Sequence, residues 1–377
     1  MTDARFFAES LSEWFARVGR DLPWRHAPTP YQVWVSELML QQTQVATVIP
    51  YYDRWIKRFP NVESLAAATL DEVNQLWAGL GYYRRASYLH RGASYIVSQL
   101  GGEFPKDIAG LRKITGIGAY TAGAIASFAF DQNVPAIDGN AERVMSRYFG
   151  IFGDVTRGEA RKTLENAAND VLSYGRARII NQAVMDLGAG ICGKKPDCAQ
   201  CPLQANCYAY RNGLAETLPQ KKSQTGKWLE YRAALLLKTP DHRFLIAQRQ
   251  NGDLLGNLWE FPMIAVYKDR SDASEAAQNA DLAMRRPRHA QWSEFLTARH
   301  SDTVRILCQT ASMDVLHIFT HIRMHVAIDC AQIPVELSVV PAENDIYSHY
   351  AWVTADEIAQ YPISTLMKKL LRSALGL

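Results

Sequence analysis

Two carboxylates have neighbours that could give them chemical roles. Glu37 lies in the apolar run 34–40 (WVSELML), with no cation within four residues. It either lies on a solvated helix face or occupies a dry pocket, where desolvation raises the pKa into the range that a general acid needs. Asp138 follows an apparently extended stretch, 134–137 (VPAI), and precedes a helix. Asp138 is therefore either a plain helix cap or a carboxylate that caps and does chemistry at once.

A short glycine-containing turn lies between Glu37 and Asp138 in the chain. Gly116 and Gly118 are placed between apolar segments, and a helix is expected to open near Tyr120. Glycine permits positive φ and close approach by another backbone, and the free N–H groups of a helix start favour an anion such as phosphate. The alternative is an ordinary turn between two helices.

Four of the six cysteines lie within 16 residues, at Cys192, Cys198, Cys201 and Cys207. Four thiolates at this spacing can surround Zn²⁺ or anchor an iron–sulfur cluster, and the spacing alone favours neither. Metal ligation is expected in preference to disulfides, because we expect the chain to be cytoplasmic.

Three further segments have side chains suited to nucleic acid. Trp24 and Arg25 share a loop, and Gln42 lies at the end of a predicted helix. Tyr82 lies in 79–85 (GLGYYRR), where tyrosines could stack on bases and arginines could meet phosphates. The alternatives are a packed tryptophan beside a solvated arginine, a helix cap, and a helix start with a solvated basic face.

The periodicity of the chain changes once, at a polar stretch that reads as a linker (216–228). Helices are expected before it, among them 3–19, 51–59 after a break at Pro50, 141–149, 157–171 and 176–189. Strands are expected after it at 231–238, 243–249, 303–309, 315–328 and 350–353, with a helix at 355–375. The pattern predicts an all-α domain followed by an α+β domain. In such a strand, His321 would more often be a core histidine.

Composition excludes several classes of protein. The chain has 377 residues, 48% of them hydrophobic, and a net charge of +3. Its length favours two domains, and its charge does not by itself argue for nucleic acid. It lacks an apolar run of membrane-spanning length and the pattern of a signal peptide, so we expect a soluble cytoplasmic protein, associated with the nucleoid if it binds DNA.

Taken together, these motifs resemble a known family. The glycine turn followed by Asp138 resembles the helix-hairpin-helix–Gly/Pro–Asp signature of the endonuclease III superfamily. Segments 22–25 (LPWR), 36–45 (SELMLQQTQV), 79–86 (GLGYYRRA) and 138–140 (DGN) look like the adenine DNA glycosylases (MutY-type). The resemblance implies a helical glycosylase domain at 1–215, with the hairpin near 111–125 and a cluster loop at 192–207. A linker at 216–228 and a Nudix-like domain at 229–377 that reads 8-oxoguanine would follow.

The resemblance also assigns roles to residues. Glu37 becomes the catalytic acid, and Asp138 the carboxylate that faces the sugar cation, accompanied by Asn140. Residues implied to contact DNA or its bases are Trp24, Arg25, Gln42, Tyr82, Gly116, Gly118 and the loop Phe319-Thr320-His321, in which threonine replaces the family's serine. Tyr120 stands where related glycosylase–lyases have a Schiff-base lysine. This implies a monofunctional enzyme with the Tyr120 hydroxyl near the reacting sugar.

The cofactor and partners follow from the same resemblance. Cys192, Cys198, Cys201 and Cys207 would hold a [4Fe–4S] cluster, although five residues separate the first two where the family usually has six. Residues 263–300 lack the Glu-rich metal helix of a Nudix hydrolase. The expected partner is double-stranded DNA with adenine opposite 8-oxoguanine or guanine, bound by a monomer and without a membrane. An endonuclease III-like glycosylase–lyase and a non-catalytic Fe–S DNA-binding protein remain as alternatives.

Overall fold

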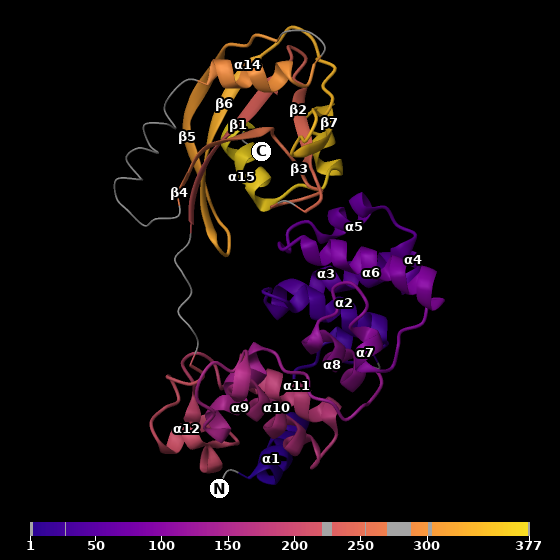
Figure 1. Cartoon of the computed structure of the whole chain (residues 1–377), viewed down its shortest axis with the longest axis vertical. Coiled ribbons are helices and arrows are strands. Elements are labelled where there is room, and N and C mark those ends of the chain that lie inside the picture. The colour runs from indigo at the N-terminus through magenta and orange to yellow at the C-terminus, as the bar shows by residue number, and fades with distance from the viewer. Residues whose placement is uncertain are drawn as a thin grey trace. The chain divides into compact units, whose positions relative to one another are not determined.

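The computed structural model describes residues 3–26, 28–220, 228–252, 254–269, 288–300 and 304–375. The chain divides into two compact units, residues 1–68 with 88–223 and residues 69–87 with 224–377 (Figure 1). The domain limits expected from the sequence therefore remain a prediction. Of the expected linker, residues 221–227 lie outside the described residues. Before them, Leu218 is buried and its carbonyl accepts a hydrogen bond from Arg147 Nε at 2.9 Å.

The first unit is helical, as predicted. Its elements are α1 (Ala4–Val18), η1 (Pro23–Arg25), α2 (Pro30–Leu40), α3 (Val45–Arg58), α4 (Val62–Ala66), most of α6 (Arg84–Leu100), α7 (Ile108–Leu111), α8 (Ala119–Phe128), α9 (Gly139–Phe149), α10 (Gly158–Leu172), α11 (Ala177–Ala189), η2 (Cys198–Gln200), η3 (Gln204–Asn206) and α12 (Tyr208–Arg211). Among the described helices, none has both the length and the apolar character of a membrane span.

A local signal explains the start of α2, whereas the signal expected to end a helix at Pro50 was misread. Helix α2 begins with a capping box formed by Thr29 and Gln32. The expected break at Pro50 is wrong, because α3 continues through it. A proline in a helix removes one backbone hydrogen bond. Here burial of Val48 and Tyr52 on either side holds the helix together.

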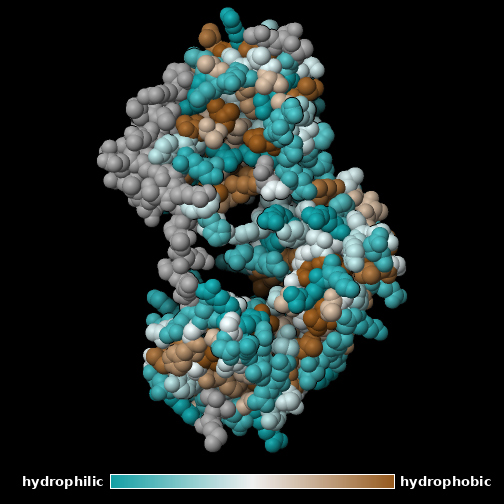
Figure 2. All heavy atoms as spheres, viewed as in Figure 1, coloured by the Kyte–Doolittle hydropathy of each residue, from teal (hydrophilic) through white to brown (hydrophobic). Residues whose placement is uncertain are grey.

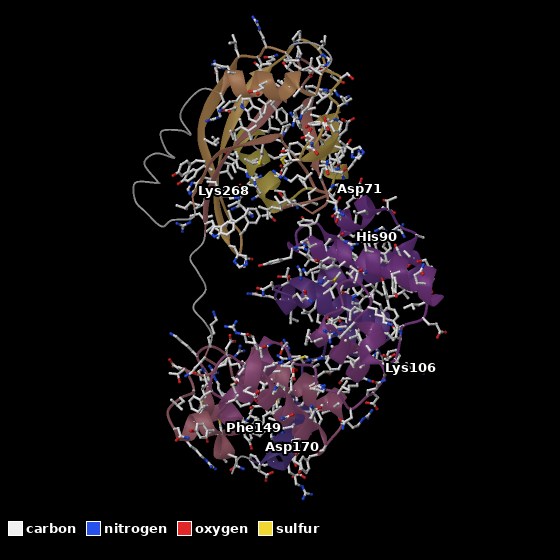
Figure 3. All side chains as sticks on the ribbon, viewed as in Figure 1. Asp71, His90, Lys106, Phe149, Asp170 and Lys268 are labelled. Carbon is white, nitrogen blue, oxygen red and sulfur yellow. The ribbon has the colours of Figure 1, made fainter. Side chains whose placement is uncertain are left out.

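The core of the helical unit forms where four helices turn apolar faces toward one another. Phe7 of α1, Tyr148 of α9, Leu164 of α10 and Ile180 of α11 are all buried in one cluster. The side chains of these helices are drawn in Figure 3, where Phe149 marks the end of α9 and Asp170 the last turns of α10. In the face shown in Figure 2, hydrophobic surface residues form small groups among hydrophilic ones. Within this core, α11 packs against α1 and α9, and α10 packs against the same two helices.

The second unit is an α+β domain, also as predicted. It contains α5 (Leu70–Trp77) and the strands β1 (Trp228–Lys238), β2 (Phe244–Arg249), β3 (Trp259–Glu260), β4 (Met263–Asp269), β5 (Cys308–Ile318), β6 (Ile322–Gln332) and β7 (Tyr347–Val353). Helices α14 (His289–Thr297) and α15 (Thr365–Leu375) and the short η4 (Glu357–Gln360) complete it. The sheet order is β3-β2-β1-β6-β5, with β4 paired to β1 and β7 to β2.

Both faces of this sheet are covered, and the sequence of β1 reflects it. Leu236 packs with α15 residues and Leu235 with α14 residues, so successive side chains enter opposite cores (Figure 1). A strand buried on both faces reads as a continuous apolar run. Strand β1 pairs in parallel with β6 along its whole length and antiparallel with β4.

One predicted strand was wrong in a way that matters for the site. Residues 315–328 were expected to form a single strand, but β5 ends at Ile318 and β6 begins at Ile322. The two strands form an antiparallel hairpin, with Ile318 paired to Arg323 and the Phe319 N–H donating to the Ile322 carbonyl at 2.8 Å. His321 is therefore an exposed turn residue and not a core histidine. The expected helix at 355–375 is η4 followed by α15.

Candidate active site

Glu37 lies in a dry environment on α2. It is 5% exposed, and the Tyr120 hydroxyl of α8 donates a short hydrogen bond to its Oε2 atom. Burial is the main cause that raises the pKa of Glu37 to about 7, and the charge of Asp138 adds to it. The Tyr120 hydrogen bond and the Arg25 charge oppose the rise. Glu37 therefore exchanges its proton near neutral pH, which is the property expected of a general acid.

Tyr120 is held as a neutral donor. Burial and the nearby carboxylates raise its pKa well above the ordinary value of 10.0. The structure thus places its hydroxyl against Glu37, while the expected contact with a sugar remains a prediction.

Asp138 caps α9 and lies close enough to Glu37 to influence its charge. Its Oδ1 accepts the Ala141 N–H at 2.7 Å, and its Oδ2 accepts Asn140 Nδ2 at 2.8 Å. Burial raises the pKa of Asp138, whereas these donors and the Arg143 charge lower it. The charge of Asp138 is close enough to influence Glu37. Asp138 thus combines the two roles that the sequence left open, a cap and a carboxylate near a second acid.

Asn140 is fixed from the cysteine side of the unit. Its Oδ1 accepts Arg143 Nη2 at 2.8 Å, and Arg143 also donates to the carbonyls of Cys192 and Gly188 at 2.8 and 2.7 Å. A Cβ added to Gly188 would lie 2.6 Å from Asn140 Cβ, so only glycine permits this approach. The position of Asp138 is therefore connected through Asn140 and Arg143 to the backbone of the cysteine loop.

A polar residue of α11 holds the segment before Asp138. Asn181 is buried; its Nδ2 donates to Ser127 Oγ at 2.9 Å and to the Val134 carbonyl at 3.0 Å, while its Oδ1 accepts the Ala136 N–H at 3.2 Å. No sequence motif assigns a role to Asn181 or to Arg143. For Asn181, a polar side chain within the largely apolar helix α11 was the available signal.

One alternative for this loop was a packed Trp24 beside a solvated Arg25, and only the first half of it holds. Trp24 is buried with its ring edge-on to Tyr52 at 5.3 Å, as in one alternative. Arg25 is not solvated, because its side chain is 12% exposed and pairs with Asp186 of α11. Its charge opposes the rise in the pKa of Glu37, so it is close enough to influence the acid. Asp186 is a further residue of the site to which no sequence motif points.

Of the two glycines that could adopt positive φ in this turn, only one does so. Gly116 has φ of 87°, whereas Gly118 has φ of −84° and caps α8 without a side-chain hydrogen bond. A Cβ on Gly116 would lie 2.7 Å from Tyr88 Cβ, and one on Gly118 would meet open space. The turn and α8 thus present backbone N–H groups at an uncrowded helix start.

The four cysteines line one cavity, together with Arg147 and Leu203. Arg147 Nη1 donates to Cys192 Sγ at 3.3 Å and to the Gly193 carbonyl at 2.6 Å. Among the described residues, no three His, Cys, Asp or Glu side chains converge on the position of a single metal ion. All four thiols are free and partly buried, and burial raises the pKa of Cys201 to about 12. The cysteines therefore surround a space with cationic and apolar walls.

Two residues expected to enter the duplex share an unusual backbone conformation. Gln42 has φ of 61° and Tyr82 has φ of 49°, and both side chains are exposed. Left-handed backbone at residues other than glycine costs on the order of 1–3 kcal/mol and clusters at functional sites. In the second unit, the Tyr82 hydroxyl lies 2.6 Å from Thr320 Oγ1. Arg85 is buried under this loop, where it donates to the Gly81 carbonyl at 2.9 Å, so it is neither a solvated nor an exposed phosphate contact.

Comparisons with known proteins identify the class to which this fold and site belong. Residues 35–169 match the HhH-GPD superfamily of base excision DNA repair proteins, and residues 233–373 match the NUDIX domain. The chain is 34% identical to the adenine DNA glycosylase of Mus musculus, covering 99% of this chain and 78% of that protein. It is 35% identical to the adenine DNA glycosylase of Homo sapiens, covering 97% and 73%. The chain belongs to the adenine DNA glycosylase family.

A solved structure supports the helical part of this assignment. A thermostable thymine-DNA glycosylase is similar with a TM-score of 0.51 and 27% identity, and the match covers 55% of this chain and 97% of that structure.

Proposed function

We propose that this protein hydrolyses the N-glycosidic bond of adenine opposite 8-oxoguanine or guanine in duplex DNA. The observation that carries the proposal is the pair of carboxylates at the active site. Burial brings the pKa of Glu37 to about 7, while Asp138 lies nearby with N–H donors on both oxygens. Cleavage of a glycosidic bond needs one acid for the leaving group and one carboxylate for the sugar cation.

The chemistry assigns one step to each group. The adenine leaves the base stack and enters the pocket beside Glu37 and Arg25. Glu37 gives its proton to the adenine ring as the bond from the sugar carbon to the ring nitrogen breaks. Asp138 then stabilises the positive sugar, or bonds to it transiently. Water adds to the sugar carbon, and its proton returns to Glu37.

Tyr120 makes the enzyme monofunctional in this proposal. A phenol cannot form the Schiff base through which a lysine opens the sugar and breaks the strand. Tyr120 instead supplies a hydrogen bond to Glu37, and Asn140 orients Asp138. The product is a strand with an abasic site.

The cavity lined by the four cysteines is the reason to propose a [4Fe–4S] cluster held by Cys192, Cys198, Cys201 and Cys207. A cluster spreads its thiolate ligands around a larger body than one ion, which suits cysteines that line a common cavity. When bound, the cluster would cross-link the loop whose backbone carbonyls Arg143 and Arg147 contact.

DNA contacts in the proposal come from each unit. The start of α8 with Gly116 and Gly118 binds a phosphate, and Gln42 probes the base pair. In the C-terminal domain, proposed to span 229–377, the turn Phe319-Thr320-His321 reads 8-oxoguanine. Exposure of Thr320 and His321 at the hairpin tip supports this role. The protein acts as a monomer.

A duplex assay tests the function. Wild type, Glu37→Gln and Asp138→Asn are incubated with adenine opposite 8-oxoguanine, and strand breaks are read with and without alkali. Alkali-dependent breaks at adenine that both variants lose support the proposal. Breaks without alkali would establish a glycosylase–lyase, and binding without breaks would establish a non-catalytic protein.

An absorption spectrum of anaerobically purified protein tests the cofactor. A brown protein with a broad visible charge-transfer band supports the cluster. A colourless protein that contains zinc overturns it.

A further inference from the structure

Asp186 joins α11 to the loop beside the proposed adenine pocket. Its side chain is 3% exposed. Arg25 reaches it with two parallel hydrogen bonds, from Nη1 to Oδ2 at 2.9 Å and from Nη2 to Oδ1 at 2.8 Å. Arg20 adds its backbone N–H to Oδ2 at 3.0 Å and its Nε to Oδ1 at 2.8 Å. Such a bidentate pair fixes a guanidinium in position and orientation.

The remaining contacts of Arg25 restrain its backbone, one face of its guanidinium and part of Nη1. Arg25 Nη1 also donates to the Arg20 carbonyl at 2.9 Å, and its guanidinium lies over the Phe15 ring at 5.3 Å. Arg178 Nη2 holds the Arg25 carbonyl at 3.0 Å. Because the stem and the ring face are occupied, Asp186 is the group that decides where the charged end points.

Asp186 also balances charge beside Glu37. Burial raises the pKa of Asp186, but the hydrogen bonds from Arg25 and Arg20 outweigh it and leave the pKa below its usual value. Asp186 is therefore an anion between two cations at neutral pH. Glu37 is faced by Tyr120 from α8, by Asp138 at the start of α9 and by Arg25 from η1. Of these, Arg25 is the cation. If its charge were less balanced by Asp186, it would favour the ionised form of Glu37 more strongly.

We propose that Asp186 is a positioning residue for adenine excision: it orients Arg25 in the base pocket and balances its charge, so that Glu37 keeps its proton. The inference rests on the proposed function, because excision is its readout. A purely structural role, in which Asp186 only ties the loop to α11, would change stability without changing how excision depends on pH.

The test compares single-turnover adenine release by full-length wild type and Asp186→Asn from pH 5.5 to 9. We expect Asp186→Asn to release adenine roughly tenfold more slowly than wild type at pH 7.5. As the pH rises, the release rate of the variant should begin to decline about one pH unit lower than that of wild type. Asp170→Asn, at an exposed position of α10, is the matched control and should behave as wild type. A wild-type pH profile for Asp186→Asn overturns the inference.

A double-mutant cycle separates action through Arg25 from a general loss of structure. In an Arg25→Gln background, Asp186→Asn should slow release less than twofold further, because its effect passes through Arg25. If the two substitutions slow adenine release independently, so that their fold-changes multiply in the double variant, the inference is overturned. If Asp186→Asn does not fold, Asp186→Glu carries the test: it keeps the charge and should retain the wild-type pH dependence at a reduced rate. If the rate of adenine release by Asp186→Glu begins to decline at a lower pH than in wild type, the inference is overturned.

The same experiment distinguishes this inference from the function beneath it. Wild type that releases no adenine overturns the proposed function. Wild type that releases adenine, matched by Asp186→Asn at every pH, overturns only the role of Asp186.

Discussion

The buried acid Glu37 of the helical unit has an environment opposite to that of the buried carboxylates of the sheet unit. In the sheet unit, Asp329 accepts two hydrogen bonds from Arg288 at 2.6 Å each and a third from Trp292 at 2.6 Å. Asp345 accepts from Arg299 at 2.7 Å. In the helical unit, Glu37 is as dry as these acids, but the partner that the structure gives it is the neutral Tyr120 hydroxyl.

The difference shows how burial can serve either stability or chemistry. Burial raises the pKa of Asp345, but Arg299 and Tyr350 outweigh it and bring the pKa below its usual value. Burial raises the pKa of Glu37 to about 7, because the opposing interactions are weaker. A paired acid keeps its charge and holds the fold, whereas an acid without a bound cation can exchange a proton near neutral pH.

The largest effect is expected from breaking a pair in the sheet unit. Asp329→Asn removes the carboxylate that pairs with buried Arg288, which should lower the local free energy of unfolding by roughly 3–5 kcal/mol. Hydrogen exchange of the β6 amides measures this change. The double variant Arg288→Met with Asp329→Leu removes both charges and should lose much less. A change below about 1 kcal/mol in Asp329→Asn would contradict the assignment of this pair to stability.

The opposite sign is expected for the acid of the helical unit. The pKa of Glu37 is about 7 in the folded protein and 4.5 as its ordinary value, so the folded state binds the proton more tightly. The associated stability is present at low pH and is lost as the pH rises from 4.5 to 7. Glu37→Gln should therefore raise the free energy of unfolding by roughly 3 kcal/mol at pH 8.5 and leave it unchanged at pH 4.

Urea unfolding followed by helical circular dichroism at both pH values measures this gain. Glu13→Gln, at an exposed position of α1, is the matched control and should stay within about 0.5 kcal/mol of wild type. Destabilisation by Glu37→Gln at pH 8.5 would show that Glu37 is a structural acid like those of the sheet.

A smaller effect should appear in the pH dependence of excision. Release of adenine should fall about tenfold per pH unit above pH 7, because only protonated Glu37 donates a proton. Tyr120→Phe removes a hydrogen bond that favours the ionised form, so its decline should begin up to about one pH unit higher. Single-turnover rates between pH 6 and 9 measure both limbs. A decline that Tyr120→Phe moves to lower pH would contradict this account of Glu37.

The smallest effect concerns the hairpin tip of the sheet unit. Thr320→Val removes the hydroxyl that lies beside Tyr82 and should reduce the preference for 8-oxoguanine over guanine about two- to tenfold, the value of one hydrogen bond. Competition between the two duplexes measures the preference. Thr320→Ser keeps the hydroxyl and should keep the preference. Equal preference in Thr320→Val and wild type would remove Thr320 from lesion reading.

The sequence predicted features that depend on neighbours in the chain. The apolar run around Glu37 indicated a possible dry carboxylate, and the residues before Asp138 indicated a helix start. It failed where a local signal was weak. The run 315–328 contains no glycine, proline or asparagine, so nothing in it marked the turn at Phe319-Thr320-His321.

Pairings over long distances could not be predicted at all. Asp186 and Arg25 are 161 residues apart, and only the packing of η1 against α11 shows that they meet. The link from Asn140 through Arg143 to the Cys192 carbonyl depends in the same way on α9 and the cysteine loop being neighbours. The residues next to Arg143 or Asp186 in the chain give no indication of these distant partners.

Gly188 has a consequence for inherited variation in a gene that encodes such a chain. Every missense change at this codon adds at least a Cβ, which would lie 2.6 Å from Asn140 Cβ. The relief of that clash moves Asn140, and Asp138 loses the amide that holds its Oδ2. Alleles altered at a residue that touches neither substrate nor cofactor should therefore score as catalytic defects, even the mildest of them, alanine.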